Sequence, residues 1–314
     1  MKRPYLFIIV LALFTMSCSK TSSYAGKKPT VYVSGLSGVL GISTQGVVWV
    51  GDSATNFSGA GEITSVSVNG RDIYSLAGKV YWKNGVDVTV PDILFSSNIL
   101  VAQNDVFIIG ASLASSNAGV GTTAAAVYWK NGSMVNLTQN LPDVVAASTK
   151  GIAVSGNDVY VCGYLYTGYN DTLDAVYWKN GQLNYLPDGY MAKCIAVSGS
   201  DVYVGGTSLH NGDVYWKNGV MQILGNASQV NAITTSGSDV YVAGYTAAGP
   251  NEACYWKNGQ LMPLPEGNAV TGIAVYASDV YCSGNTNSNH ACFWKNGVVD
   301  TLGVGVTSSI VVGP

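Results

Sequence analysis

Two short motifs repeat the same charged and aromatic residues along the chain. Val-Tyr-Trp-Lys-Asn-Gly occurs at residues 80–85 and recurs, whole or with one or two changes, at 127–132, 176–181, 214–219, 254–259 and 292–297. Asp-Val-Tyr-Val-x-Gly occurs at 158–163, 201–206, 239–244 and 279–284, with variants at 72–75 and 105–108. Six lysines arranged in a ring would form an anion-binding surface, and six aspartates would suggest a metal site.

A structural interpretation explains the two motifs better. If they form adjacent antiparallel strands, Asp158 faces Lys179 and the pairs that follow are Val159 with Trp178, Tyr160 with Tyr177 and Val161 with Val176. The one unit with Thr30 in place of the aspartate has Val50 in place of the lysine. We therefore expect paired charges that fix the register, and tryptophans that pack between neighbouring units.

Candidate ligand-binding residues lie between the two motifs, where the sequence does not repeat. Aromatic rings mixed with amides and carboxylates suit a glycan or a protein partner, because they offer stacking faces and polar contacts. The same residue types also form ordinary solvated turns. The candidates are Tyr164, Tyr166, Tyr169, Asp171, Asp174, His210, Asn251, Glu252 and His290.

Catalysis receives less support from the residues. Arg71 is the only arginine after residue 3, so the chain cannot supply the arginine triad of propeller hydrolases that resemble sialidases. The two histidines and the absence of a CxxC pattern argue against a metal centre, and nothing implies a cofactor. A polysaccharide hydrolase or lyase that uses carboxylates such as Asp171, Asp174 and Glu252 remains the alternative to a non-catalytic binding module.

The spacing of the repeats predicts the fold that must position these residues. The seven tryptophans lie at 49, 82, 129, 178, 216, 256 and 294, separated by 33 to 49 residues. Each unit holds four short strands, represented by 151–154, 158–161, 176–179 and 182–186, and Asn-Gly between the last two is typical of a two-residue hairpin turn. Seven such units predict an all-β, seven-bladed β-propeller.

The ends of the repeat region predict how the ring closes. The first unit has strands at 31–35 and 46–50 but lacks the strand that should precede them, whereas residues 307–312 match that missing strand. We expect the N- and C-terminal strands to pair within one blade, which removes the open edges of the ring.

Five cysteines follow residue 18: Cys162, Cys194, Cys254, Cys282 and Cys292. The expected register places Cys282 opposite Cys292 in one blade. Export would permit a disulfide between them, but cross-strand geometry often strains such a bond. The sequence therefore leaves two alternatives open, a disulfide and two free thiols.

The N-terminal residues predict export and lipid anchoring. Lys2 and Arg3 precede an apolar run at 5–14, and Thr15-Met16-Ser17 lead to Cys18, an order that resembles a bacterial lipoprotein signal. An ordinary secretory signal with an incidental cysteine is the alternative. We expect a signal peptide at 1–17, a lipidated Cys18 with a tether at 18–28, and a propeller at 29–314 in the cell envelope, anchored to the outer membrane on its periplasmic or surface face.

The charge of the chain excludes one class of partner. Without Lys2 and Arg3 the chain has 13 basic and 18 acidic side chains and no basic stripe. We therefore expect no nucleic-acid partner, because neutralising phosphates requires clustered lysine and arginine.

Two segments resemble known bacterial repeats. Asn289-His-Ala-Cys-Phe-Trp-Lys-Asn-Gly-Val-Val-Asp-Thr-Leu-Gly303 resembles the extracellular repeats of the HAF type, and Asp239-Val-Tyr-Val-Ala-Gly-Tyr-Thr246 is similar to a common bacterial propeller repeat. The resemblance implies an exported propeller and no particular activity. We therefore expect a lipid-anchored module that binds a glycan or a surface protein with its variable loops.

Overall fold

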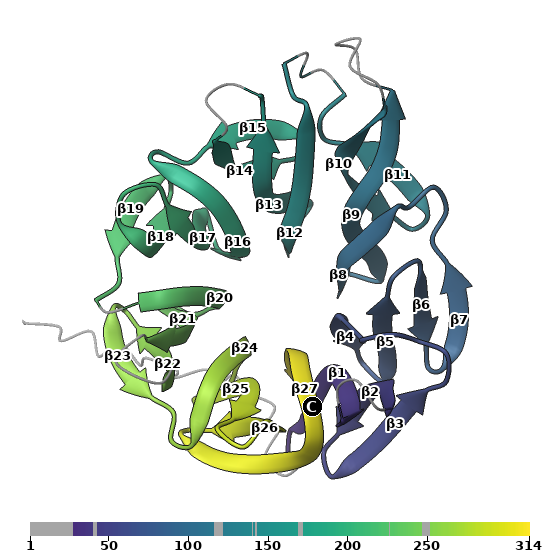
Figure 1. The fold of residues 1–314 in the computed structure, drawn as a ribbon, viewed down its shortest axis with the longest axis vertical. Helices are drawn as coiled ribbons and strands as arrows, with labels where there is room; N and C mark the ends of the chain where they lie inside the picture. The colour runs from purple at the N-terminus through teal and green to yellow at the C-terminus, as the bar shows by residue number, and fades with distance from the viewer. Residues whose placement is uncertain are drawn as a thin grey trace, which may run out of the picture.

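The computed structural model describes residues 28–39, 43–115, 122–139, 141, 143–168, 172–225, 227–246 and 252–314. Within these ranges the chain forms antiparallel β-strands arranged around a central axis (Figure 1). Five sheets have four strands each, and a sixth sheet of seven strands combines two blades. The predicted seven-bladed propeller is confirmed. No helix in the described ranges is long and apolar enough to cross a membrane.

The blades follow one another in chain order, each with its first strand nearest the axis (Figure 1). Blade 1 contains β4 (Ser65–Asn69), β5 (Asp72–Ala77), β6 (Val80–Lys83) and β7 (Val86–Thr89). Blade 2 contains β8 (Phe95–Ala102), β9 (Asp105–Ser115), β10 (Thr122–Lys130) and β11 (Ser133–Asn136). Blade 3 contains β12 (Ala146–Ser155), β13 (Asp158–Tyr166), β14 (Leu173–Lys179) and β15 (Gln182–Tyr185).

The second half of the ring repeats this arrangement. Blade 4 contains β16 (Gly189–Ser198), β17 (Asp201–Ser208), β18 (Gly212–Lys217) and β19 (Val220–Ile223). Blade 5 contains β20 (Ala227–Ser236), β21 (Asp239–Thr246), β22 (Glu252–Lys257) and β23 (Gln260–Pro263). Blade 6 begins with β24 (Gly267–Tyr276), β25 (Asp279–Thr286) and β26 (His290–Lys295).

One long strand closes the ring. The first part of β27 (Val298–Gly313) pairs with β26 as the outer strand of blade 6, and its second part pairs with β1 (Thr30–Val39) as the inner strand of blade 7. Blade 7 is completed by β2 (Ser43–Val50) and β3 (Ser53–Phe57). The predicted closure by N- and C-terminal strands is therefore confirmed.

The core lies between neighbouring blades. Trp216 of blade 4, for example, belongs to the same buried cluster as Tyr160 and Ala175 of blade 3. Six of the seven tryptophans are at most 4% exposed, as predicted, whereas Trp82 is half-buried and lies against Phe57. The tryptophans are thus part of the scaffold and not a stacking platform for ligands.

The predicted register between the two repeated motifs is wrong by two residues. Lys179 lies opposite Tyr160, and Trp178 lies opposite Val161. The shift arises because Asn180 pairs with Val159. The side-chain oxygen of Asn180 accepts a hydrogen bond from the Val159 backbone amide, and the backbone amide of Asn180 donates to the Val159 carbonyl. A shift of two residues leaves every side chain on the expected face of the sheet, so the prediction of which residues are buried is unaffected.

The six Asp–Lys pairs nevertheless form, across a diagonal of the ladder. Their Nζ–Oδ2 distances are 2.7 to 3.0 Å, and the asparagine of each hairpin turn donates to the other oxygen of the same carboxylate. These hydrogen bonds lower the pKa of each carboxyl group below its usual value of 3.8, with the lysine contributing most in four blades and the asparagine in two. The repeated charges therefore hold the hairpins together and leave no free anion or metal site.

These carboxylates predict how stability depends on pH. Because folding depresses each pKa, the pairs stabilise the protein above the ordinary aspartate pKa, and their contribution is lost as the pH falls through the depressed values. We expect the urea midpoint to be nearly level between about pH 7 and pH 5 and to fall below about pH 4. Replacing Asp201, Asp239 and Asp279 by asparagine should make that fall shallower.

A matched variant controls for the loss of three negative charges. Asp52, Asp87 and Asp300 are exposed and form no ion pair within the described residues, so their replacement by asparagine should leave the acid slope unchanged. Equal slopes in the two triple variants would contradict the assignment.

Candidate functional site

Seven polar residues, one from each blade, surround the mouth of the central channel. Six lie on inner strands, and Thr64 directly precedes β4. Six of them are bulged out of the ladder: in blade 3, for example, Thr149 pairs with Gly163 and Gly151 pairs with Cys162, so that Lys150 has no partner opposite. A bulge re-aims the side chain it carries. We call these residues the channel ring, and all seven line one cavity of about 430 Å³: Thr64, Ser97, Lys150, Lys193, Asn231, Thr271 and Ser308.

The glycine of the Asp-Val-Tyr-Val-x-Gly motif makes the bulge sterically possible. A Cβ atom added at Gly163 would lie 1.9 Å from the carbonyl oxygen of Ser148, two residues before Lys150. The same backbone clash, at 1.8 to 2.2 Å, occurs at the equivalent glycine of every blade with a recorded bulge. Blade 1 has Ala77 at this position, and its described inner strand pairs without a bulge. The repeated glycine therefore shapes the channel mouth.

The channel ring opens toward the variable connections. Lys193 donates to Asp213, which follows the β17–β18 connection, and Ser308 donates to Glu62, in the connection between β3 and β4. Asp213 is only 5% exposed and also accepts from the Thr207 hydroxyl. Its hydrogen bonds fix the position of the Lys193 ammonium group at the edge of the channel.

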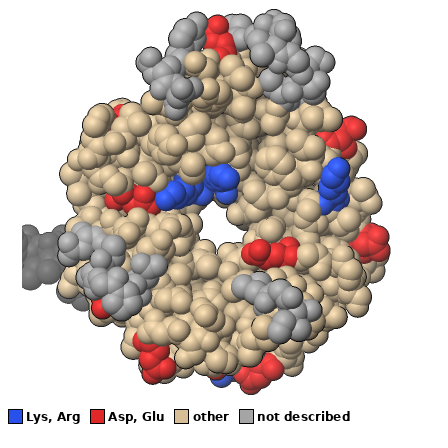
Figure 2. Space-filling view, in the orientation of Figure 1, with Lys and Arg blue, Asp and Glu red and all other residues tan. Residues whose placement is uncertain are grey.

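Lys150 differs from Lys193 in having no carboxylate partner among the described residues. It is exposed, and its ammonium group lies 5.6 Å from the centre of the Tyr164 ring. Figure 2 shows basic side chains at one edge of the central opening, with acidic side chains beside them and across the opening from them. The lining of the cavity itself contains two lysines and no carboxylate. The lining therefore favours an anionic group next to Lys150, although Asp213 pairs with Lys193 and Glu62 accepts a hydrogen bond from Ser308 at the same mouth.

A second ring of aliphatic residues lies two positions after the channel ring on each inner strand and lines the same cavity. The members of this aliphatic collar are Val66, Ile99, Ile152, Ile195, Ile233, Ile273 and Ile310. The channel thus offers polar and cationic groups next to an apolar wall. That combination suits a ligand with both hydroxyl groups and C–H faces.

The loop residues proposed from the sequence that the structure describes lie at several places. Among them, Tyr164 borders the channel ring through its contact with Lys150. Tyr166 ends β13, Asp174 lies in β14 of the same blade, and His290 begins β26. Glu252 begins β22 and lines a separate cleft with Glu266. Tyr169, Asp171 and Asn251 lie outside the described residues, as does Cys18.

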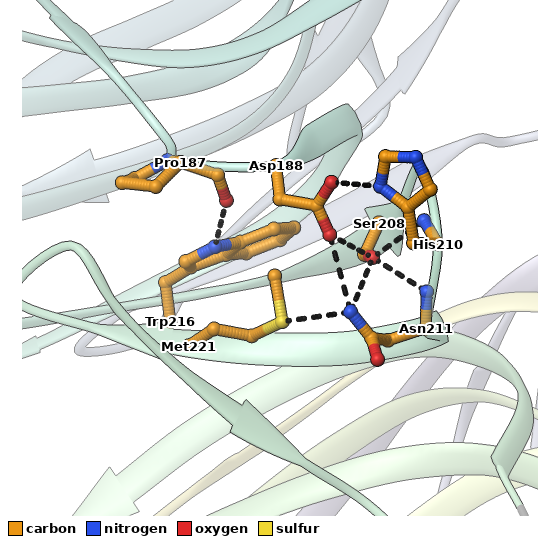
Figure 3. Close-up of polar contacts among 7 residues, drawn as sticks. All are labelled: Pro187, Asp188, Ser208, His210, Asn211, Trp216 and Met221. Carbon is orange, nitrogen blue, oxygen red and sulfur yellow. Dashed lines mark hydrogen bonds and ion pairs between the residues drawn. The ribbon is translucent and has the colours of Figure 1, made fainter.

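His210 belongs to a polar cluster that shapes a turn (Figure 3). Asp188 accepts hydrogen bonds from Ser208 Oγ at 2.9 Å and Asn211 Nδ2 at 3.1 Å, and its second oxygen contacts His210 Nδ1. Ser208 Oγ in turn accepts from the backbone amides of His210 and Asn211. The contact with His210, followed by that with Ser208, lowers the pKa of Asp188.

This cluster lacks the geometry of a nucleophilic relay. The imidazole contacts the carboxylate and not the serine hydroxyl. The Asp188 carboxylate that accepts from this hydroxyl has a lowered pKa, which makes it a weak base. We conclude that the four residues stabilise the β17–β18 connection. Among the described residues no group of three or more histidine, cysteine or carboxylate side chains is arranged to hold a metal ion.

The expected pairing of Cys282 with Cys292 is wrong. The two-residue register shift places Cys282 opposite Trp294 and Cys292 opposite Gly284, and both thiols are free in the structure. Burial raises the pKa of Cys194, Cys254 and Cys292 to about 12 and that of Cys282 still higher. Such thiols remain protonated at neutral pH and act as core residues rather than nucleophiles.

Comparison with known proteins supports the fold and leaves the function open. The chain matches no protein-family model and no curated protein by sequence. Acylaminoacyl peptidase of Pyrococcus horikoshii is similar in structure over 88% of this chain, with a TM-score of 0.55 and 14% identity. The chain spans 51% of that protein's length.

Two further structures show weaker similarity. A putative TolB from Agrobacterium tumefaciens matches 91% of this chain and 98% of its own, with 11% identity and a TM-score of 0.44. PorZ, a surface component of the type-IX secretion system of Porphyromonas gingivalis, matches 84% of this chain and 41% of its own, with 13% identity and a TM-score of 0.35. The peptidase match, at low identity, establishes that this chain has a β-propeller-like fold and nothing further.

Proposed function

We propose that the protein is an exported, lipid-anchored propeller that binds a glycan or protein partner at the channel mouth without catalysis. The observation that carries the proposal is the channel ring, in which every blade contributes at least one polar residue to a single cavity. The bulges that create this ring require a glycine in six blades. Such a feature positions side chains without improving the packing of the core, which supports a role in binding.

The site favours a glycan over a protein surface. Its polar side chains are hydroxyl, amide and ammonium groups, and the adjacent aliphatic collar provides an apolar wall. The large hydrophobic residues that are most exposed, Val86, Leu113, Val220, Ile223 and Val298, do not line this cavity. A protein partner would be expected to need a broader apolar patch at the mouth.

A glycan array with blocked variants tests the proposal. We expect the purified propeller to bind a subset of glycans, and Ser97→Trp or Thr271→Trp to abolish that binding by filling the channel mouth. Ser133→Trp, at the exposed first residue of β11, should bind like the wild type. Binding that persists in both mouth variants would place the ligand elsewhere, and release of shorter sugars from a bound polysaccharide would support the hydrolase or lyase alternative.

The anchor is tested separately from the binding site. If Cys18 is lipidated, detergent should be required to release the wild-type protein from membranes, whereas Cys18→Ala should be released without it. Equal release of both proteins would contradict the anchor and favour an ordinary secretory signal.

A further inference from the structure

We infer that the ligand at the channel mouth is an acidic saccharide whose carboxylate or sulfate group binds Lys150, with Lys193 as the second cation. This inference rests on the proposed function and names the chemistry of the ligand. It depends on three features of the channel: the ion pairing of the two lysines, the Tyr164 ring beside Lys150, and the aliphatic collar.

The two lysines occupy equivalent positions in adjacent blades, 3 and 4. Both are bulge residues and both line the cavity of about 430 Å³, whose lining contains no carboxylate. Lys193 is already paired with the buried Asp213, at 2.7 Å. Lys150 has no such partner in the described part of the chain, so its charge remains available to a ligand anion.

The other members of the channel ring are held by contacts within the protein. Asn231 donates to the Val270 carbonyl at 2.7 Å, Thr271 shares a hydrogen bond with Thr307 at 2.8 Å, and Ser97 donates to the Thr149 carbonyl at 3.2 Å. Each of these three side chains is therefore held in place by a hydrogen bond to the protein itself. A ligand therefore meets a preorganised ring in which Lys150 provides the strongest unused interaction.

The surroundings of Lys150 distinguish a saccharide from an inorganic anion. The Tyr164 ring lies next to Lys150, which keeps this ammonium group beside an aromatic surface, and the collar residue Ile152 lines the cavity two positions further along the same strand. The cavity volume falls within the range of about 300–1,000 Å³ that is typical of small-ligand sites. Hydroxyl, C–H and acidic groups of one sugar unit could thus all find partners.

Calorimetric titration with three oligosaccharides of equal length tests the inference: an oligogalacturonate, a sulfated oligogalactan and a neutral oligogalactan. We expect at least one acidic probe to bind about tenfold more tightly than the neutral probe at low salt, and the advantage to shrink as salt rises. The two acidic probes distinguish carboxylate from sulfate as the preferred group.

Variants of Lys150 identify the residue responsible. Lys150→Met should fold normally, because no buried carboxylate depends on Lys150 for its ion pair. The variant should lose about tenfold in affinity for the acidic probe, whereas Lys150→Arg should retain binding. Lys79→Met is the matched control, because Lys79 is exposed, forms no ion pair in the described ranges and lies outside the cavity. Equal affinities of Lys150→Met and Lys79→Met would overturn the inference.

The remaining outcomes separate this inference from the function on which it rests. Equal binding of neutral and acidic probes, blocked by Ser97→Trp, would overturn the inference and leave the binding function intact. Binding of hexaglutamate as tight as that of the acidic sugars would overturn the choice of a saccharide. Failure of every probe to bind would overturn the inference, whereas the proposed binding function would then be decided by the glycan array.

Discussion

Gly244→Ala should destabilise the propeller severely although it adds a single methyl group. The new Cβ atom would lie 1.8 Å from the carbonyl oxygen of Gln229 and 2.8 Å from its carbonyl carbon, both backbone atoms of the paired inner strand. Backbone in a hydrogen-bonded ladder cannot move aside as a flexible side chain can. We expect a loss of about 3 kcal/mol or more, measured as a lower urea midpoint and a melting temperature reduced by roughly 6 °C or more.

Gly225→Ala is the matched control for this substitution. Gly225 belongs to the same blade region, has no positive φ, and a Cβ atom there would meet nothing within 4 Å. Its melting temperature should differ from that of the wild type by about 1 °C at most. If Gly244→Ala were as stable as Gly225→Ala, the inner strand would have to relax without cost, and the bulge could not hold Asn231 in a fixed position.

The architecture could be predicted because its signals are local and repeated. Asn-Gly at the end of each third strand predicts a hairpin turn, and the structure places both residues at positive φ, as at Asn180 and Gly181. The period of two along each strand then assigns the buried face. The predicted register between the second and third strands is wrong because residues of opposite charge need not lie directly opposite each other. In the structure Lys179 reaches diagonally to Asp158 across Tyr160.

The channel ring was missed because a bulge interrupts the alternation on which strand prediction relies. Lys150 and Lys193 directly precede Gly-Ile-Ala-Val and Cys-Ile-Ala-Val, so Lys150 lies just before the strand predicted at 151–154. A usable signal exists: this position varies among lysine, asparagine, serine and threonine while the residues after it repeat. The repeated glycine of the neighbouring strand is the second signal, because it marks where the inner strand approaches too closely for a side chain.

The predicted binding site in the loops rests on their variable sequence and on their mixture of aromatic and polar residues. Variable loops often carry binding residues, but His210 and its neighbours satisfy one another within a turn. The contact between Tyr164 and Lys150 joins the predicted loop residues to the channel. Sequence alone could not reveal it, since the two residues lie on different strands and only the bulge brings the lysine toward the ring.

Trp216→Ala should cause the other large loss of stability. Trp216 is fully buried between blades 3 and 4, and removing its indole leaves a cavity in that interface. We expect a loss of about 3–5 kcal/mol in the free energy of unfolding. Trp82→Ala, at the one half-buried tryptophan, should cost clearly less. Equal losses in urea titrations would mean that burial between blades does not determine the contribution of these tryptophans.

Phenylalanine variants separate the hydrogen bond of the indole from its packing. Trp216 Nε1 donates to the Pro187 carbonyl at 3.0 Å (Figure 3), whereas the buried Nε1 of Trp178 has no partner among the described residues. Both substitutions remove similar apolar area, but only Trp216→Phe breaks a hydrogen bond and leaves a carbonyl unpaired. It should therefore cost about 1 kcal/mol more than Trp178→Phe. Equal costs in parallel urea titrations would show that the bond to Pro187 adds nothing beyond the packing of the ring.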